Sequence, residues 1–236
     1  MLTKKNQKLR IGVLALQGDF AEHIQALERA DKDVSAFAVR YAHELVGDDA
    51  IDALVIPGGE STAIARLVDD GNDPIFAAIK DRVKGGMPIY GTCMGSIFLA
   101  REIEGSSQGR LALMDITVRR NAFGPQRKSF ESELKIAALG PEPLPAVFIR
   151  APIILSCGPA VQVMARLEDE TETGSEAVTG IVMARQDNML VTAFHPEIAD
   201  DYRVHQYFID MVRSAQVKLL STVETSAHCT LTRSAS

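Results

Sequence analysis

Short apolar runs rich in β-branched residues alternate with segments of helical periodicity along the first half of the chain. The runs lie at residues 11–16, 34–39, 53–56 and 88–90, and each has the length and composition of a buried strand. Between them, apolar residues recur at helical spacing around residues 20–27 and 75–83. Strands that alternate with helices are typical of a parallel sheet covered on both faces. We therefore predict a three-layer α/β fold with a mostly parallel central sheet flanked by helices.

The second half has further apolar runs but fewer helical segments between them. The runs lie at residues 115–118, 146–150, 161–166, 177–185 and 190–194. Strands joined without long crossovers pair antiparallel, so we predict a partly antiparallel extension of the sheet. A last helix is expected to begin near Asp200 and Asp201, which are suitable caps. Its inner face would carry Val204, Phe208 and Met211.

Composition indicates where the folded domain ends and which classes of binding partner are not expected. The chain has 236 residues, of which 46% are hydrophobic and 24% charged, as in an ordinary globular protein. After about Gln216 the sequence turns to Ser and Thr without aromatics, which predicts a single domain over 9–216 and a disordered tail over 217–236. The net charge of −6 argues against nucleic acid as the main partner. No apolar run approaches the ~18 residues that cross a bilayer, so no membrane association is expected.

The cysteines bear on compartment and metal binding. Cys93, Cys157 and Cys229 are scattered and odd in number, without metal-type spacing. We expect neither a disulfide framework nor a metal site, and a reducing, cytoplasmic setting fits better. Cys157, followed by Gly and Pro, is expected in a turn.

Cys93 is the candidate nucleophile. It is the centre of Gly-x-Cys-x-Gly at residues 91–95, between an apolar strand and an amphipathic helix that we expect to run to Ala100. This is the cysteine counterpart of the nucleophile elbow, where flanking glycines allow close backbone approach. The helix N-terminus would stabilise a thiolate and present the Met94 N–H to an oxyanion. Taken alone, the motif fits a buried packing cysteine equally well.

His195 and Glu197 form the candidate base pair. They follow an apolar strand as His-Pro-Glu, and residues two apart on an extended chain point to the same side. Pro196 favours that extended conformation, so the carboxylate can orient the imidazole while its other nitrogen faces the thiol. A lone histidine is usually structural, and we interpret His23 and His205 as packing or surface residues.

A glycine turn follows the strand at residues 53–56. Gly58-Gly59 can offer a backbone N–H that completes an oxyanion hole with Met94. A plain turn with Ser61 as a helix N-cap explains the same residues. A phosphate loop is not expected, because no Gly-Lys-Ser or Gly-Lys-Thr follows.

These three pieces in this order resemble the class I glutamine amidotransferases, a Cys–His–Glu family with a flavodoxin-like fold. Further runs narrow the resemblance to the glutaminase subunits of pyridoxal 5′-phosphate synthase. The matching runs are residues 11–20, 57–62, 91–93, 120–124 and 148–152. The likeness covers roughly residues 9–212 and is specific in combination.

The resemblance implies a role for each matching residue. Cys93 would form a glutamyl thioester, His195 would transfer protons, and Glu197 would orient it. The backbone N–H groups of Gly59 and Met94 would bind the oxyanion. Gln17 would couple activation to binding of the partner. The residues that would bind glutamine are Gly59, Glu60, Ser61, Arg120, Ile149 and Arg150.

The resemblance also implies partners and leaves alternatives. The ammonia would pass to a (β/α)₈-barrel synthase subunit in a large hetero-oligomer, and no cofactor would be needed. Met94 stands where the family usually has alanine, and Pro125 where it has arginine, which puts the pocket shape and a nearby loop in doubt. The alternatives are a glutaminase of another pathway such as histidine biosynthesis, a non-catalytic protein on the same fold, and a hydrolase of other γ-glutamyl compounds.

Overall fold

Five parallel strands form one half of the central sheet. The structure is a computed structural model that describes residues 8–47, 50–60, 73–123, 129–167 and 180–231. The parallel strands are β2 (Val34–Val39), β1 (Leu9–Leu14), β3 (Ala53–Ile56), β4 (Ile89–Thr92) and β12 (Met189–Thr192), in that spatial order. The last strand of the chain therefore lies beside β4, with Thr192 opposite Thr92. This pairing brings two segments that are far apart in sequence side by side in the middle of the sheet.

The other half of the sheet is mainly antiparallel, as predicted. Beyond β12 the order continues through β11 (Gly180–Gln186), β9 (Ile153–Cys157), β6 (Met114–Arg119) and β5 (Ala100–Ile103), while β10 (Gln162–Leu167) pairs with β11. A separate hairpin of β7 (Ser129–Leu134) and β8 (Leu144–Ile149) forms a second sheet. Two short 3₁₀ turns, η1 (Ala42–Leu45) and η2 (Ala137–Leu139), complete these connections.

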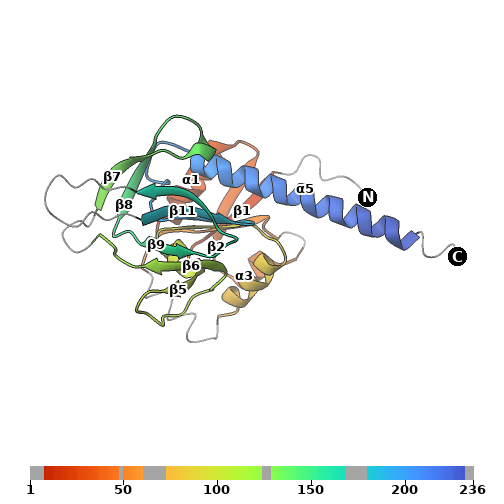
Figure 1. The fold of residues 1–236 in the computed structure, drawn as a ribbon. Helices are drawn as coiled ribbons and strands as arrows, with labels where there is room; N and C mark the ends of the chain where they lie inside the picture. Colours follow the sequence, from red (N-terminus) through yellow and green to blue (C-terminus); the bar gives the residue numbers. More distant parts are fainter. Residues whose placement is uncertain (1–7, 48–49, 61–72, 124–128, 168–179, 232–236) are drawn as a thin grey trace.

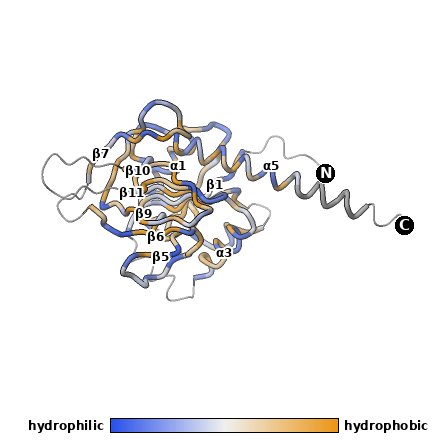
Figure 2. Tube along the Cα trace, viewed as in Figure 1, coloured by the Kyte–Doolittle hydropathy of each residue, from blue (hydrophilic) through white to orange (hydrophobic). Residues whose placement is uncertain are grey.

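Helices cover both faces of the parallel half. The helices are α1 (Phe20–Ala30), α3 (Pro74–Lys84), α4 (Met94–Leu99) and α5 (Arg203–Leu231). Successive residues of a strand point to opposite faces, so Val55 packs in one apolar cluster with α1 and α5 whereas Leu54 packs in another with α3 and α4. Hydrophobic residues accordingly concentrate along the central strands (Figure 2). The predicted three-layer arrangement is thus observed.

Three local predictions are corrected. The helix after Cys93 ends at Leu99, and the chain turns directly into β5, because Ala100 pairs with Met114 of the neighbouring strand. Cys157 is the last residue of β9, opposite Ile116, so the expected turn begins one residue later. The strand β7 escaped prediction because its sequence, SFESEL, is mostly polar and its side chains alternate between exposed and half-buried positions.

The last helix begins as expected but is longer. Asp201 accepts a hydrogen bond from the Arg203 N–H at 3.1 Å, and Val204, Phe208 and Met211 are buried. The helix then continues to Leu231, past the domain limit at residue 216 that composition predicted, and residues 232–236 lie outside the described residues. Its far end projects from the body of the molecule (Figure 1). A helix that is already nucleated gains one backbone hydrogen bond for each added residue, so it can extend where composition alone does not predict structure.

Among the described helices, none has both the length and the apolar character that a membrane crossing needs.

Candidate active site

Cys93 lies on a strained turn between β4 and α4. Its φ of 46° and ψ of −104° belong to a conformation that non-glycine residues rarely adopt, at a cost of order 1–3 kcal/mol. The Cys93 N–H donates to the Thr192 carbonyl at 2.8 Å, and the Ser96 hydroxyl donates to the Cys93 carbonyl at 2.7 Å. A Cβ on Gly95 would lie 2.2 Å from the Ile56 carbonyl oxygen, so this glycine permits the close approach of β3. These contacts hold the nucleophile in the geometry of an elbow.

Met94 is the first residue of the short helix after the nucleophile. Its side chain is 1% exposed and belongs to the apolar cluster on the α3 and α4 face. The methionine side chain therefore packs into the core. Its backbone N–H stays in the first turn of the helix, where an alanine would also place it. A helix N-terminus directs N–H groups and a partial positive charge toward an anion.

His195 and Glu197 form a tight buried pair. His195 Nδ1 lies 2.6 Å from Glu197 Oε1, and the two residues are 4% and 7% exposed. The His195 N–H donates to the Val147 carbonyl at 2.8 Å, which fixes the chain after β12 against the β7–β8 hairpin. The Nδ1 contact leaves the Nε2 of the ring for the thiol.

The charges of this pair are stabilised mutually. Burial alone would lower the pKa of His195, but hydrogen bonds with Cys93 and Glu197 outweigh burial and raise it to about 10. Burial would raise the pKa of Glu197, but His23 and His195 outweigh it and lower the pKa to about 2. At neutral pH the pair is therefore an imidazolium and a carboxylate, with a proton held beside the sulfur.

The glycine turn after β3 contacts the base. A Cβ on Gly58 would lie 2.3 Å from His195 Cε1, so glycine is the residue that leaves room for the ring. Gly59 has a φ of +145°, and a Cβ on it would lie 3.2 Å from the side-chain amide nitrogen of Gln17. The Gln17 amide donates to the Glu60 carbonyl at 2.5 Å. Ser61 lies outside the described residues.

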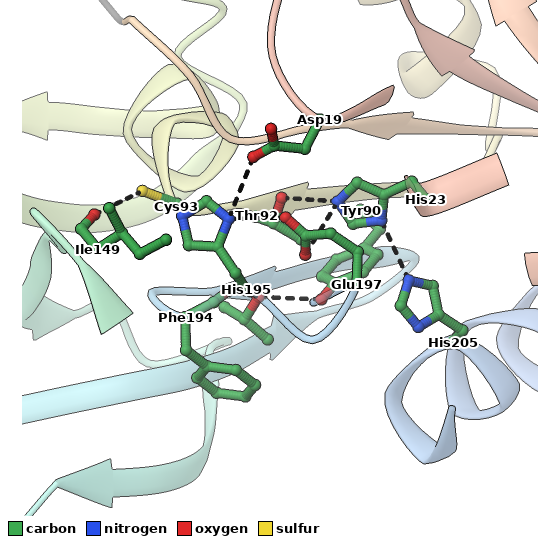
Figure 3. A network of polar contacts seen from close by, with 11 residues as sticks. Asp19, His23, Tyr90, Thr92, Cys93, Ile149, Phe194, His195, Glu197 and His205 are labelled. Atoms are coloured by element: carbon green, nitrogen blue, oxygen red, sulfur yellow. Dashed lines mark hydrogen bonds and ion pairs between the residues drawn. The ribbon is translucent and has the colours of Figure 1, made fainter. Parts of the chain in front are cut away.

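The predicted glutamine-binding residues come from two places in the fold: Gly59 and Glu60 lie on the glycine turn, whereas Ile149, Arg150 and Arg120 lie at or just after the ends of β8 and β6. The Cys93 thiol points to the Ile149 carbonyl, with Sγ 3.8 Å from the oxygen (Figure 3). Arg150 follows with a φ of 44° and is exposed. Arg120 is half-buried and donates to the Gln108 side chain. A hydrogen bond of 3.0 Å from the Ala122 N–H to the Ala151 carbonyl brings the Arg120 turn alongside this segment.

Three polar residues near the base were missed or misread in the sequence. Asp19 Oδ2 lies 3.7 Å from His195 Nδ1, and its pKa is raised by burial and by Glu197. His23 and His205, expected as packing or surface residues, are both fully buried and contact each other behind Glu197 (Figure 3). The available signal was His23 on the apolar face of a predicted helix, because a buried polar side chain requires a partner.

Asp19, His195 and Glu197 also offer three possible metal ligands within 4.8 Å of one another. A metal ion there would need Nδ1 of His195, which already donates to the carboxylate of Glu197. The donor set therefore serves the histidine better than it serves a metal, and no cofactor is implied by it.

The chain is similar in sequence to proteins of known name. The chain is 50% identical over 204 residues to pyridoxal 5′-phosphate synthase subunit PdxT of Carboxydothermus hydrogenoformans, covering 86% of this chain and 98% of that protein. It is 45% identical over 212 residues to the protein of the same name from Methanosarcina acetivorans, with coverage of 87% and 100%.

Solved structures of glutamine amidotransferases have a similar fold. A crystal structure described as a glutamine amidotransferase superposes with a TM-score of 0.73 at 41% identity, over 86% of this chain and 98% of that one. A glutamine amidotransferase of Thermotoga maritima, 13% identical with a TM-score of 0.54 and coverage of 89% and 86%, shares the fold. These findings confirm the fold class and the family predicted from the motifs. The model of the SNO glutamine amidotransferase family matches residues 13–214, and the chain belongs to that family.

Proposed function

We propose that this protein hydrolyses L-glutamine to L-glutamate and ammonia through a thioester on Cys93. The observation that carries the proposal is the His195–Glu197 pair, at 2.6 Å, beside a cysteine on a strained elbow. A nucleophile, a base and an orienting carboxylate in one buried group are the parts that acyl transfer requires. The PdxT relatives and the family match support glutamine as the substrate.

The first half-reaction forms the thioester. The Cys93 sulfur adds to the carbonyl carbon of the glutamine side chain, and the oxyanion is bound by the N–H groups of Gly59 and Met94. The His195 imidazolium gives its proton to the amide nitrogen, the C–N bond breaks, and ammonia leaves. Glu197 stabilises the imidazolium throughout.

The second half-reaction releases glutamate. Neutral His195 removes a proton from water, the hydroxide adds to the thioester carbon, and the C–S bond breaks. The glutamic acid so formed loses its carboxyl proton to solvent and leaves as glutamate, while the proton taken from water stays on His195 beside the Cys93 thiolate. The same histidine therefore acts first as an acid and then as a base.

The substrate's own charges require complementary side chains. A free α-carboxylate is bound best by a cation and an α-ammonium by an acceptor. Arg120 and Arg150 supply the cations, Glu60 supplies an acceptor, and Ile149 lies beside the sulfur. Ser61 completes the group that we assign to glutamine.

We assign the ammonia to pyridoxal 5′-phosphate synthesis in the cytoplasm. The relatives named as subunits of that synthase support a partner that receives the ammonia, which we take to be its (β/α)₈-barrel subunit in a large hetero-oligomer. Gln17 lies between Gly59 and Glu60, where a partner that moves the β1–α1 loop would alter the oxyanion hole.

One assay tests the reaction and the pathway separately. Glutamate release is measured with and without the barrel subunit, for the wild type and for Cys93→Ala. We expect weak activity alone, stimulation by the partner, and none above background in the variant. Activity that survives Cys93→Ala would refute the mechanism. Wild-type hydrolysis that ignores this partner but responds to another synthase would leave glutaminase chemistry standing and refute the pathway.

A further inference from the structure

His23 joins three separate elements behind the base pair. It lies on α1, fully buried, with Nε2 3.0 Å from Thr92 Oγ1 and 3.3 Å from Glu197 Oε2. Its Nδ1 lies 3.1 Å from Nε2 of His205 on α5. The ring thus contacts the residue before the nucleophile, the carboxylate that orients the base, and the last helix (Figure 3).

The contacts select one tautomer for each histidine. The Glu197 carboxylate is an acceptor, so the nitrogen that faces it must carry a proton, which places the His23 proton on Nε2. Nδ1 of His23 is then an acceptor, and Nε2–H of His205 donates to it. The remaining nitrogen of His205, Nδ1, is buried without a hydrogen-bond partner among the described residues, as suits an unprotonated nitrogen better than a proton-bearing one.

Both histidines are neutral in this arrangement. Burial lowers the pKa of His23 below its ordinary value, although Glu197 opposes that shift. Burial and the neighbouring His23 lower the pKa of His205 to about 3. A neutral His23 has one N–H, which lies between the oxygens of Thr92 and Glu197.

The second oxygen of Glu197 depends on this N–H. Oε1 is bound to His195, whereas Oε2 forms no hydrogen bond of ordinary geometry within the described part of the chain. His23 Nε2 at 3.3 Å is therefore the donor available to Oε2, shared with the Thr92 hydroxyl. With a hydrogen bond at Oε1 and the His23 N–H within 3.3 Å of Oε2, rotation of the carboxylate is restricted, and so is the direction of its contact with the imidazole.

We propose that His23 is a positioning residue: it holds the carboxylate of Glu197 in the orientation that aligns His195 with Cys93, and His205 sets the tautomer that lets it do so. The kinetic part of this inference rests on the proposed glutaminase function, whereas the geometric part does not. At metal sites, removal of an outer-shell group that orients a ligating histidine typically changes affinity or activity about 10–100-fold, and we expect an effect of the same size here.

The sharpest test compares two replacements at one site. His23→Leu has similar size and no donor, whereas His23→Gln retains an N–H at the end of the side chain. We expect His23→Leu to lower kcat about 10–100-fold with KM changed less than about two-fold, and His23→Gln to recover part of the loss. Tyr90→Phe is the matched control, since it removes a buried hydrogen bond of 2.9 Å to Thr192 from the same core. That control should retain wild-type kcat.

A double-mutant cycle shows whether His23 acts through Glu197. In a Glu197→Gln background, adding His23→Leu should lower kcat by less than a further factor of about two, because the carboxylate that His23 positions is already lost. Full additivity of the two losses would overturn the proposal. So would equal losses in His23→Leu and His23→Gln with native circular dichroism.

A titration without turnover separates this inference from the proposed function. The ionisable groups facing Glu197 come from its own segment, from α1 and the turn before it, from β4 and from α5: His195, His23, Asp19, Tyr90 and His205. With ¹³C-labelled glutamate, the Glu197 carboxylate should take up a proton at higher pH in His23→Leu than in the wild type, because the charged form has lost its donor.

The two failures are distinguishable. A wild type that does not hydrolyse glutamine, but whose Glu197 titration moves in His23→Leu, would refute the proposed function and support the positioning role. An unmoved titration in a folded His23→Leu protein would refute the positioning role, whatever the enzyme activity.

Discussion

The two sides of His195 are built differently. On the inner side, Glu197, His23 and His205 are buried and joined by short polar contacts across three elements. On the outer side, Gln17 is half-buried and hydrogen-bonded to the backbone of exposed Glu60, and Arg150, which follows Ile149, is also exposed. Under the proposed function, the difference teaches that the base is oriented before substrate arrives, whereas recognition falls to groups that water and substrate can both reach.

Glu197→Gln should give the largest effect on the inner side. The amide cannot stabilise an imidazolium, and it can turn the histidine to the wrong tautomer, which costs about 10⁴-fold in a comparable triad. We expect a loss of about 10³–10⁴-fold in kcat, measured as glutamate release at saturating glutamine. A loss below ten-fold would mean that the buried side does not orient the base.

The same variant should flatten the pH dependence of stability. The pKa of Glu197 is lowered to about 2, so its contribution is complete above its ordinary value of 4.5 and is lost as pH falls toward 2. The pKa of His195 is raised to about 10, so its contribution is complete below its ordinary value of 6.5 and is lost as pH rises toward 10. Urea unfolding across pH should therefore show highest stability between about pH 4.5 and 6.5 from this pair, and a weaker dependence in Glu197→Gln.

Gly58→Ala tests the boundary between the two sides. The new methyl would lie 2.3 Å from His195 Cε1, so the ring or the turn must move. A displacement near 1 Å costs about 100-fold in rate, and we expect that loss in kcat with the fold retained. Gly86→Ala is a useful control, because a Cβ there meets nothing within 4 Å, although its φ of +97° adds some strain. Wild-type kcat in Gly58→Ala would show that the turn yields without disturbing the base.

Arg120→Ala and Arg150→Ala test whether the outer side binds the substrate. If these cations bind the substrate carboxylate, their loss removes a charged hydrogen bond of about 1.5–3 kcal/mol, or about 10–100-fold in kcat/KM. We expect the effect mainly in KM, in contrast to the inner-side variants. Arg119→Ala is the matched control, because Arg119 is paired with Glu104 at 2.5 Å on the surface. A fall in kcat at unchanged KM would remove the arginine concerned from the recognition side.

Asp19→Asn should have the smallest effect of the series. Its carboxylate is 3.7 Å from His195 Nδ1 with a side chain 45% exposed, so water screens the interaction. Loss of the negative charge should lower the pKa of His195 slightly and change kcat within about three-fold. The ¹⁵N shift of the His195 ring followed against pH measures it. A large loss would place Asp19 with Glu197 as a second essential partner.

Local patterns predicted the parts of the fold that depend on local sequence. The strands at 34–39 and 53–56 and the start of α5 agree because an apolar run or a cap is enough to define them. β5 and β7 could not be read in this way. The chain at Ala100 is a strand because it pairs with β6, where Met114 lies opposite Ala100. The polar segment β7 is a strand because it pairs with β8.

The sequence by itself determined the nucleophile's elbow, the His-Pro-Glu pair and the family, because each is contained in a few consecutive residues. Only the tertiary structure decided what supports them. His23 and His205 are 182 residues apart, and His23 meets both Glu197 and His205 only because β12 lies beside β4 and α5 packs on α1. Helical periodicity places a histidine on an inner face, but the partner that satisfies its nitrogen comes from another element, which no local pattern specifies.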